Sequence, residues 1–328
     1  MKVTILGLGS WGTALAVRMG PRHELRGWTH DAVQREALRK EGENRKYLPG
    51  VSLPPSLSVL NDPAEALRGA DLVFFAVPSF AVRDLARAVK RDLGGTPVVN
   101  VAKGMEEESG SLPLQVLAEE LGPEHPAASL VGPSHAEEAA RDHPTAVVAT
   151  SRDPGTTRLV QGAVTDDRLR VYTNDDPFGV ELAASLKNVI AIAAGIAAGL
   201  GYGDNTLGAL LTRGLAEMTR LGTGLGAKPE TFFGLAGVGD LITTCVSRWS
   251  RNRRVGEAVG RGEPLARVLE GMTMVAEGVR TTRAARDLAR RHGVEMPIVE
   301  RVYAVLFENQ PPMAAIHALM TRERKAEV

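Results

Sequence analysis

The chain of 328 residues carries 39 basic and 39 acidic side chains, so its formal net charge is zero, and 44% of its residues are hydrophobic. This balance argues against a protein whose main role is to bind nucleic-acid phosphates or an anionic membrane. The single cysteine, Cys245, excludes an internal disulfide framework and a cysteine-based zinc site within one chain. The N-terminal run MKVTILGLGS lacks the layout of a signal peptide. We therefore expect a cytoplasmic protein without a metal, a nucleic-acid partner or an integral membrane segment.

The first half of the chain alternates short apolar runs with helix-like segments, a pattern typical of an α/β fold with a Rossmann-type, doubly wound and mainly parallel sheet. Unbroken apolar runs such as LVFFAV predict strands that are covered on both faces. The expected strands are Val3–Leu6, Leu25–Trp28, Leu72–Val77, Pro97–Val101, Ser129–Val131 and Ala146–Thr150. Helices are expected near residues 12–20, 31–41, 79–92, 112–121 and 156–164.

The second half is expected to be all helical, because after about Phe178 the strand signals stop and stretches with 3.6-residue spacing follow. The length predicts two domains. A turn-rich stretch at 172–179 predicts domains of residues 1–178 and 179–328. The apolar run Val189–Leu200 is too short to span a membrane and contains two glycines, so a buried core helix is expected there.

A glycine motif, GLGSWG, follows the first expected strand directly and opens a helix. Gly7 would make the tight turn, Gly9 would let the backbone approach a pyrophosphate, and Gly12 would let helix and strand pack closely. Amides at the helix N-terminus would then face the phosphates. The motif predicts a dinucleotide-binding domain over residues 1–178, with an ordinary strand-to-helix turn as the alternative.

The residues after the second strand should decide between NAD and NADP, because an acid there binds the ribose 2′-hydroxyl and a basic residue favours a 2′-phosphate. The sequence offers His30 and Asp31, with Arg35 one turn further on. These cues conflict. Asp31 could hold the ribose or could be only the N-cap of the next helix.

Lys187 is the most unusual charged residue, because its neighbours one turn away are alanines and Asn188 follows it. A buried ammonium is costly, and burial shifts its pKa downward toward a value suited to proton transfer. The alternative is a lysine whose stem lies along the core while its head reaches water.

Two segments follow expected strands at the end where ligands bind in open α/β sheets. Lys103 stands in VAKG, with a solvated loop lysine as the alternative. The segment GPSH, from Gly132 to His135, opens a helix whose first amides could receive a ligand oxygen. We interpret His135 as a polar residue at the helix start, because the sequence shows no partner for a catalytic base.

Two further polar segments lie in the second half. In GVGDLITTC, Asp240 and Thr244 share one face if the stretch is helical, and a helix cap is the alternative for Asp240. In SRWSRNRR, Arg251 and Asn252 are forked donors of the kind that clamp a phosphate, although charge clusters are more often solvated helix faces.

In this order, the pieces resemble the bacterial-type NAD(P)-dependent glycerol-3-phosphate dehydrogenases over nearly the whole chain. The resemblance is carried by GLGSWGTALA, ENRKYLPG, VAKG, VGPSHAEE, VYTNDDPFGVELAASLKNVIAIAAGI, GLGYGDNTLGALLTRGLAEM, GVGDLITTC, SRNRR, AEGVRTT and VEMPI. It implies reversible hydride transfer between NAD(P)H and dihydroxyacetone phosphate, giving sn-glycerol 3-phosphate for glycerophospholipid synthesis. A homodimer is likewise implied only by the resemblance.

The resemblance also implies residue roles. Lys187 would be the catalytic proton donor to the ketone oxygen, with Lys103, Asp240 and Asn188 completing a polar cage. Substrate binding would involve Lys103, Gly132, Ser134, Lys187, Asp240, Thr244, Ser250, Arg251 and Asn252. Cofactor binding would involve Gly7, Gly9, Ser10, Trp11, Gly12, His30, Asp31, Tyr47, Lys103, Ala136, Arg251, Val275 and Glu277.

Two other functions fit the same architecture. A 3-hydroxyacid dehydrogenase also needs a catalytic Lys and Asn, although SRN and GDLITTC favour a phosphate substrate. A non-catalytic NAD(P)-sensing protein would keep the nucleotide site without turnover. The sequence leaves open the preference between NAD and NADP, the oligomeric state, the direction of the reaction and any feedback inhibition.

Overall fold

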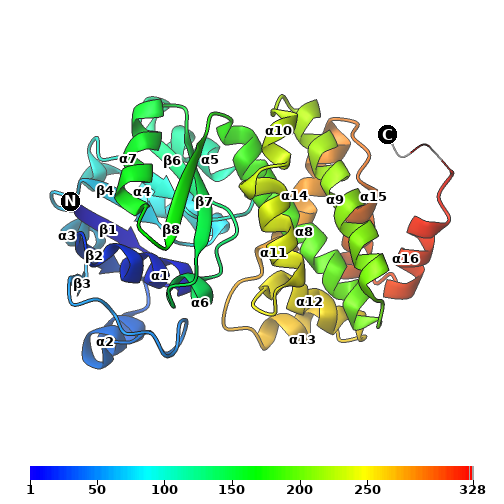
Figure 1. Ribbon diagram of the computed structural model, residues 1–328, viewed down its shortest axis with the longest axis horizontal. Helices are drawn as coiled ribbons and strands as arrows, with labels where there is room; N and C mark the ends of the chain where they lie inside the picture. The colour runs from blue at the N-terminus through cyan, green and yellow to red at the C-terminus, as the bar shows by residue number, and fades with distance from the viewer. Residues whose placement is uncertain (325, 327–328) are drawn as a thin grey trace.

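The computed structural model describes residues 1–324 and 326. It consists of a sheet-containing part at the N-terminal end and a helical part beside it, with the two described chain ends on opposite sides of the molecule (Figure 1). The expected fold class, a mainly parallel Rossmann-type sheet followed by helices, is confirmed.

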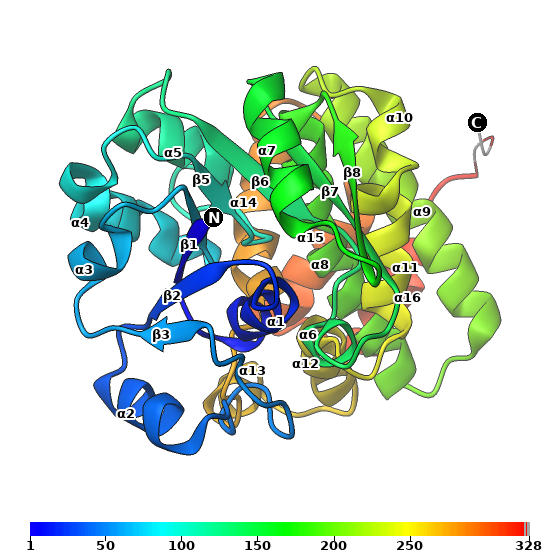
Figure 2. The same ribbon diagram turned by 60° about the vertical axis from the view of Figure 1, so that its left-hand side comes forward.

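The sheet has eight strands within the described part of the chain, in the order β3-β2-β1-β4-β5-β6-β7-β8, and Figure 2 shows β3 toward one edge and β8 toward the other. The strands are β1 (Lys2–Leu6), β2 (Glu24–Trp28), β3 (Leu57–Val59), β4 (Leu72–Phe75), β5 (Val98–Asn100), β6 (Ala127–Val131), β7 (Thr145–Ser151) and β8 (Leu169–Asn174). All neighbours are parallel except β6 and β7. Because the chain order reverses between β1 and β4, the carboxyl ends of these two strands form the crevice in which such sheets bind ligands.

Helices cover both faces of the sheet, as the unbroken apolar runs predict. They are α1 (Ser10–Met19), α2 (Ala32–Glu41), α3 (Pro63–Leu67), a 3₁₀ turn at Ser79–Ala81, α4 (Val82–Leu93), α5 (Pro113–Leu121), α6 (Ala136–Ala139) and α7 (Pro154–Val164). Strand β4 shows the arrangement, since Phe74 packs with residues of α1 and α7 while Phe75 packs with residues of α4 and α5.

The sequence analysis places six strands correctly and misses β3 and β8. Strand β3 is only three residues long, and β8 is an edge strand whose residues alternate between buried and exposed, so neither forms an apolar run. Tyr172, for example, is 45% exposed. The short helix α3 was also not expected, whereas α6 begins directly after GPSH, where a helix was expected.

The helical part is built around α8, a helix of 23 residues. Its helices are α8 (Pro177–Gly199), α9 (Asp204–Gly224), α10 (Pro229–Phe232), a π turn at Leu235–Gly239, α11 (Asp240–Val246), α12 (Arg251–Gly260), α13 (Leu265–Glu270), α14 (Glu277–Arg291), α15 (Pro297–Phe307) and α16 (Pro312–Met320). In the described residues α8 is the one helix long and apolar enough to cross a membrane, but 83% of its most apolar window is buried in the protein. The expectation of a core helix is therefore confirmed.

Helices α8 and α12 approach each other through glycines. A Cβ atom built on Gly195 of α8 would lie 2.0 Å from the Arg253 carbonyl oxygen, and one on Gly256 of α12 would lie 2.1 Å from the Ile192 carbonyl oxygen. Only glycine allows two helix backbones to come so close. This contact fixes the position of the polar residues at the N-terminal end of α12 relative to those of α8.

The transition between the two parts is short, since β8 ends at Asn174 and α8 begins at Pro177. The boundary expected after residue 178 falls within the first turn of α8. We propose the boundary at Asp176, which caps α8 through the Gly179 amide and also accepts hydrogen bonds from the Lys228 amide and the Thr231 hydroxyl.

Candidate active site

Lys187 lies in the middle of α8 with only 4% of its surface exposed. Its Nζ donates hydrogen bonds to Asp240 Oδ1 at 3.0 Å and to Thr244 Oγ1 at 2.7 Å. Burial among apolar neighbours lowers the pKa of Lys187 to about 8, although Asp240 opposes this shift. The lysine therefore does not reach bulk water, and its amine can exchange a proton near neutral pH.

Asp240 is shared by two lysines. It lies at the start of α11 with 2% of its surface exposed, and its Oδ2 accepts a hydrogen bond from Lys103 Nζ at 2.9 Å while Oδ1 accepts from Lys187. Burial raises the pKa of Asp240, but the charges of Lys103 and Lys187 outweigh burial and hold the pKa below its ordinary value. One carboxylate thus faces two ammonium groups. When both lysines are protonated, the cluster carries a net positive charge.

Lys103 follows β5 at the carboxyl end of the sheet. Its Nζ also donates to the Gly132 carbonyl at 2.5 Å and to Ser134 Oγ at 3.1 Å, both in the loop after β6. The side chain is 17% exposed, so it is not the solvated loop lysine of the alternative interpretation. Because parallel β5 and β6 end side by side, the two loops meet and bring these residues together.

A chain of amide groups joins Lys103 to the helical part. Asn188 Nδ2 donates to the Lys103 carbonyl at 2.7 Å, and Asn252 Nδ2 donates to Asn188 Oδ1 at 2.8 Å. The Gly278 amide then donates to Asn252 Oδ1 at 2.9 Å. Helices α8, α12 and α14 are thereby tied to the loop after β5.

The residues expected to form a phosphate clamp lie at the N-terminal end of α12. Ser250 caps the helix by accepting a hydrogen bond from the Arg253 amide at 3.2 Å. Burial lowers the pKa of the Arg251 guanidinium, with the charges of Glu137 and Glu277 acting against this effect. Among the described residues Arg251 forms no salt bridge within 4.0 Å. A half-buried cation without an ion pair among the described residues is suited to bind an anion.

The glycine motif fits the roles expected for it. Gly7, with φ of 108°, turns so tightly that a Cβ atom there would lie 2.4 Å from the Ala76 carbonyl oxygen at the end of β4. A Cβ on Gly12 would lie 2.0 Å from the Gly7 carbonyl oxygen, whereas a Cβ on Gly9 would meet nothing within 4 Å. Gly7 and Gly12 thus serve backbone packing, and the space beside Gly9 stays free for a ligand.

The start of α1 suits a pyrophosphate. The helix has no side-chain cap and no acid in its first turn, so its first amides keep their positive potential. Ser10 is buried as the first residue of α1, and Trp11 has a buried indole Nε1 with no hydrogen-bond partner in the part of the chain described. These features fit a dinucleotide, and we keep the contacts of Ser10 and Trp11 with it as proposals.

Asp31 is the N-cap of α2. Its Oδ1 accepts hydrogen bonds from two α2 amides at 3.0 and 3.1 Å, and its Oδ2 pairs with Lys46 Nζ at 3.0 Å. The α2 amide hydrogen bonds and Lys46 lower the pKa of Asp31. His30 is exposed and Tyr47 half-buried beside this pair. The capping interpretation is confirmed, and Lys46 is a charged neighbour that the sequence analysis missed.

The remaining expected cofactor positions are Glu277, Val275 and Ala136. Glu277, at the start of α14, accepts hydrogen bonds from the Ser79 amide at 2.9 Å and from Ser79 Oγ at 2.5 Å. Burial raises the pKa of Glu277. Val275, just before α14, is 36% exposed, and Ala136 is buried at the start of α6. Their contacts with a cofactor stay predictions.

His135 belongs to the lysine cluster electrostatically. It occupies the N-cap position of α6, as expected for a helix-start residue, but its side chain caps nothing. Burial and then the charges of Lys103 and Lys187 lower its pKa to about 4. The imidazole is therefore neutral at pH 7. The sequence analysis could not detect this proximity, because the two lysines lie about 30 and 50 positions away in the chain.

Glu181 is a second residue that the sequence analysis did not select. It is 2% exposed on α8, and it accepts hydrogen bonds from Ser129 Oγ, from Asn100 Nδ2 at 3.2 Å and from the Leu114 amide at 3.0 Å. Burial raises its pKa to about 7. Glu181 thus joins α8 to β5, to β6 and to the start of α5, and its signal in the sequence is a lone acid in an apolar helix.

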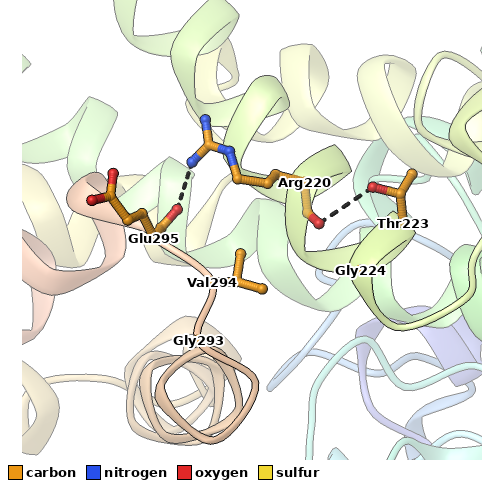
Figure 3. A pocket seen from close by; sticks show the side chains of 6 residues that line it. All are labelled: Arg220, Thr223, Gly224, Gly293, Val294 and Glu295. Carbon is orange, nitrogen blue, oxygen red and sulfur yellow. Dashed lines mark hydrogen bonds between the residues drawn. The ribbon is translucent and has the colours of Figure 1, made fainter.

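A hollow elsewhere on the surface is not part of this site. Figure 3 shows this pocket of about 600 Å³ between the end of α9 and the turn from α14 to α15, where the Arg220 guanidinium donates to the Glu295 carbonyl. None of the expected site residues lines it.

Within residues 1–324 and 326, no group of three His, Cys, Asp or Glu side chains is arranged to hold a metal ion.

Comparisons with known proteins agree over the whole chain. Two family models match, described as the N-terminus of NAD-dependent glycerol-3-phosphate dehydrogenase over residues 2–157 and its C-terminus over residues 176–317. A protein named glycerol-3-phosphate dehydrogenase (NAD(P)+) from Desulfitobacterium hafniense is 50% identical, covering 100% of this chain and 93% of that protein. Another of that name, from Moorella thermoacetica, is 50% identical and covers 99% and 97%. A crystal structure of glycerol-3-phosphate dehydrogenase from Coxiella burnetii is similar with a TM-score of 0.94, 38% identity and coverage of 98% and 99%.

The Rossmann-type sheet, the helical part packed on it and the buried lysine pair near the strand ends define a nicotinamide-dependent oxidoreductase. Within this class, the chain belongs to the family of NAD-dependent glycerol-3-phosphate dehydrogenases.

Proposed function

We propose that this protein catalyses reversible hydride transfer between NAD(P)H and dihydroxyacetone phosphate, giving sn-glycerol 3-phosphate. The observation that carries the proposal is the buried Lys187–Asp240–Lys103 cluster at the carboxyl ends of the strands. The identity of 50% to glycerol-3-phosphate dehydrogenases over the full chain supports the choice of substrate.

When bound, the nicotinamide supplies a hydride to the carbonyl carbon. The chain's own residues manage the charge that develops on the ketone oxygen. Lys187 donates a proton from Nζ to that oxygen during reduction and accepts it in the reverse direction, which its pKa of about 8 favours near neutral pH. Lys103 adds a second positive charge, and Asp240 holds both amines in place.

The substrate phosphate is bound by the start of α12. Arg251 supplies a half-buried cation, and Asn252 and Ser250 stand beside it on the same turn. Gly132, Ser134 and Thr244 contact the substrate near the two lysines, to which they are hydrogen-bonded. Fixing both ends of a three-carbon substrate presents one face of its carbonyl to the nicotinamide.

A spectrophotometric assay of NADH and NADPH oxidation tests the proposal. Dihydroxyacetone phosphate should support turnover with at least one of the two cofactors, and short 2-oxo and 3-oxo acids should not. Turnover with the acids alone would instead establish a 3-hydroxyacid dehydrogenase. Cofactor binding without any turnover would establish the NAD(P)-sensing protein.

The proposal also covers the compartment, the metabolic role and the oligomeric state of the enzyme. We infer a cytoplasmic enzyme that supplies glycerol 3-phosphate for glycerophospholipid synthesis and that acts as a homodimer. The single, buried Cys245 is compatible with a reducing compartment. Sedimentation of the purified protein distinguishes a dimer from a monomer.

A further inference from the structure

The segment after α2 lies against the glycine loop. Asn44 Nδ2 donates to the Leu8 carbonyl at 2.8 Å and to Thr13 Oγ1 at 2.7 Å. The end of β2 is also fixed there, because the Gly7 amide donates to the Trp28 carbonyl at 2.7 Å. Residues 29–31 and 44–47 are therefore held beside the glycine loop, where the adenosine ribose of a dinucleotide lies in this fold.

Asp31, the acid at the end of β2, already has most of its acceptor capacity engaged. Its Oδ1 serves two α2 amides, and its Oδ2 lies 3.0 Å from Lys46 Nζ. Lys46 is also held 5.1 Å from the centre of the Tyr47 ring. With its carboxylate engaged and its charge balanced, Asp31 gives little of the repulsion that makes an acid at this position reject a 2′-phosphate.

A second cation lies close to this pair. One Arg35 terminal nitrogen donates to the Thr29 carbonyl, while Arg35 Nε is buried without a hydrogen-bond partner in the described residues. The Lys46 side chain remains 47% exposed, so its ammonium has room for another anionic partner. Arg35 is thus held at Thr29, just after β2, and Lys46 is held at Asp31.

Building on the proposed function, we propose that Lys46 determines cofactor specificity. By neutralising Asp31 and facing the ribose position, Lys46 lets the site accept a ribose 2′-phosphomonoester, so that the protein binds NADP as well as NAD. Without Lys46, Asp31 would act as the free acid that selects NAD.

The test measures binding of two adenosine probes by calorimetry, 2′,5′-ADP and 5′-AMP, which differ only in the 2′-phosphate. The wild type should bind 2′,5′-ADP at least as tightly as 5′-AMP. Lys46→Gln should shift the ratio of the two dissociation constants toward 5′-AMP by about tenfold or more, the expected size of a lost contact to a charged group. Lys40→Gln removes the same charge from the exposed last turn of α2 and should leave the ratio unchanged.

Asp31→Asn provides the opposite perturbation, because asparagine still caps the helix but carries no charge. It should shift the ratio toward 2′,5′-ADP. An unchanged ratio in Lys46→Gln, an equal shift in Lys40→Gln, or rejection of 2′,5′-ADP by the wild type would overturn the assignment of Lys46. Probe binding needs no turnover, so failure of the dihydroxyacetone phosphate assay would refute the proposed function without affecting this result.

Discussion

Replacing Asp240 by asparagine should move the pH dependence of catalysis to lower pH. The Lys187 Nζ to Asp240 Oδ1 distance is 3.0 Å, which at an effective dielectric constant of about 20 corresponds to an attraction of about 5.5 kcal/mol. Since one pKa unit equals about 1.4 kcal/mol, this attraction is equivalent to about four units. Because the asparagine still accepts a hydrogen bond and neighbours relax, we expect about half of this shift. The pKa of Lys187 should then fall from about 8 to about 6.

The assay is the pH profile of kcat for dihydroxyacetone phosphate reduction. Reduction requires protonated Lys187, so activity falls as pH rises through its pKa, near 8 in the wild type and near 6 in Asp240→Asn. Thr244→Val is the matched control, since it removes the other hydrogen-bond partner of Lys187 without changing charge, and its profile should shift much less. A profile for Asp240→Asn that still declines near pH 8 would refute the pairing as the determinant of the lysine's pKa.

Three further perturbations test separate parts of the account. Arg251→Ala should raise the KM for dihydroxyacetone phosphate about tenfold or more with a smaller change in kcat, and an unchanged KM would contradict the phosphate clamp. Gly195→Ala should destabilise the protein by about 1–3 kcal/mol because its Cβ would meet the Arg253 backbone, whereas Gly162→Ala, in open space on α7, should be neutral or stabilising in the same thermal melts. Burial raises the pKa of Glu217 to about 7, so the folded state retains a proton that the unfolded state releases. The free energy of unfolding should therefore fall as pH rises from about 4.5 to about 7. Glu217→Gln should flatten this dependence in thermal melts across that range.

Local sequence patterns were sufficient for much of the sheet and for the glycine loop. Apolar runs such as Leu72–Phe75 mark buried strands because both faces are covered. Strand β8 could not be found in this way, since half of it faces solvent at the edge of the sheet. Its pairing with β7 depends on residues about 25 positions away, which no local window contains.

In the candidate site, too, some residues could be selected from local sequence patterns, whereas contacts between distant segments could not be predicted. Lys187 could be selected because an isolated charge in an apolar helix is visible in the sequence itself. Its pairing with Asp240 and the neutral state of His135 depend on contacts between distant segments, so spacing alone could not give them. Asp31 shows a further limit, because its role as the cap of α2 was one of two interpretations of the sequence, whereas its partner Lys46 becomes evident only once the loop after α2 is in place.

The most direct test of the central claim is single-turnover reduction of dihydroxyacetone phosphate by Lys187→Met, with NADH and NADPH binding measured on the same sample. Methionine fills a similar apolar volume but cannot transfer a proton. The account predicts that the hydride-transfer rate falls by about 10²–10⁴ while cofactor affinity stays close to that of the wild type. A rate within a few-fold of the wild type would show that the buried amine is not the proton donor.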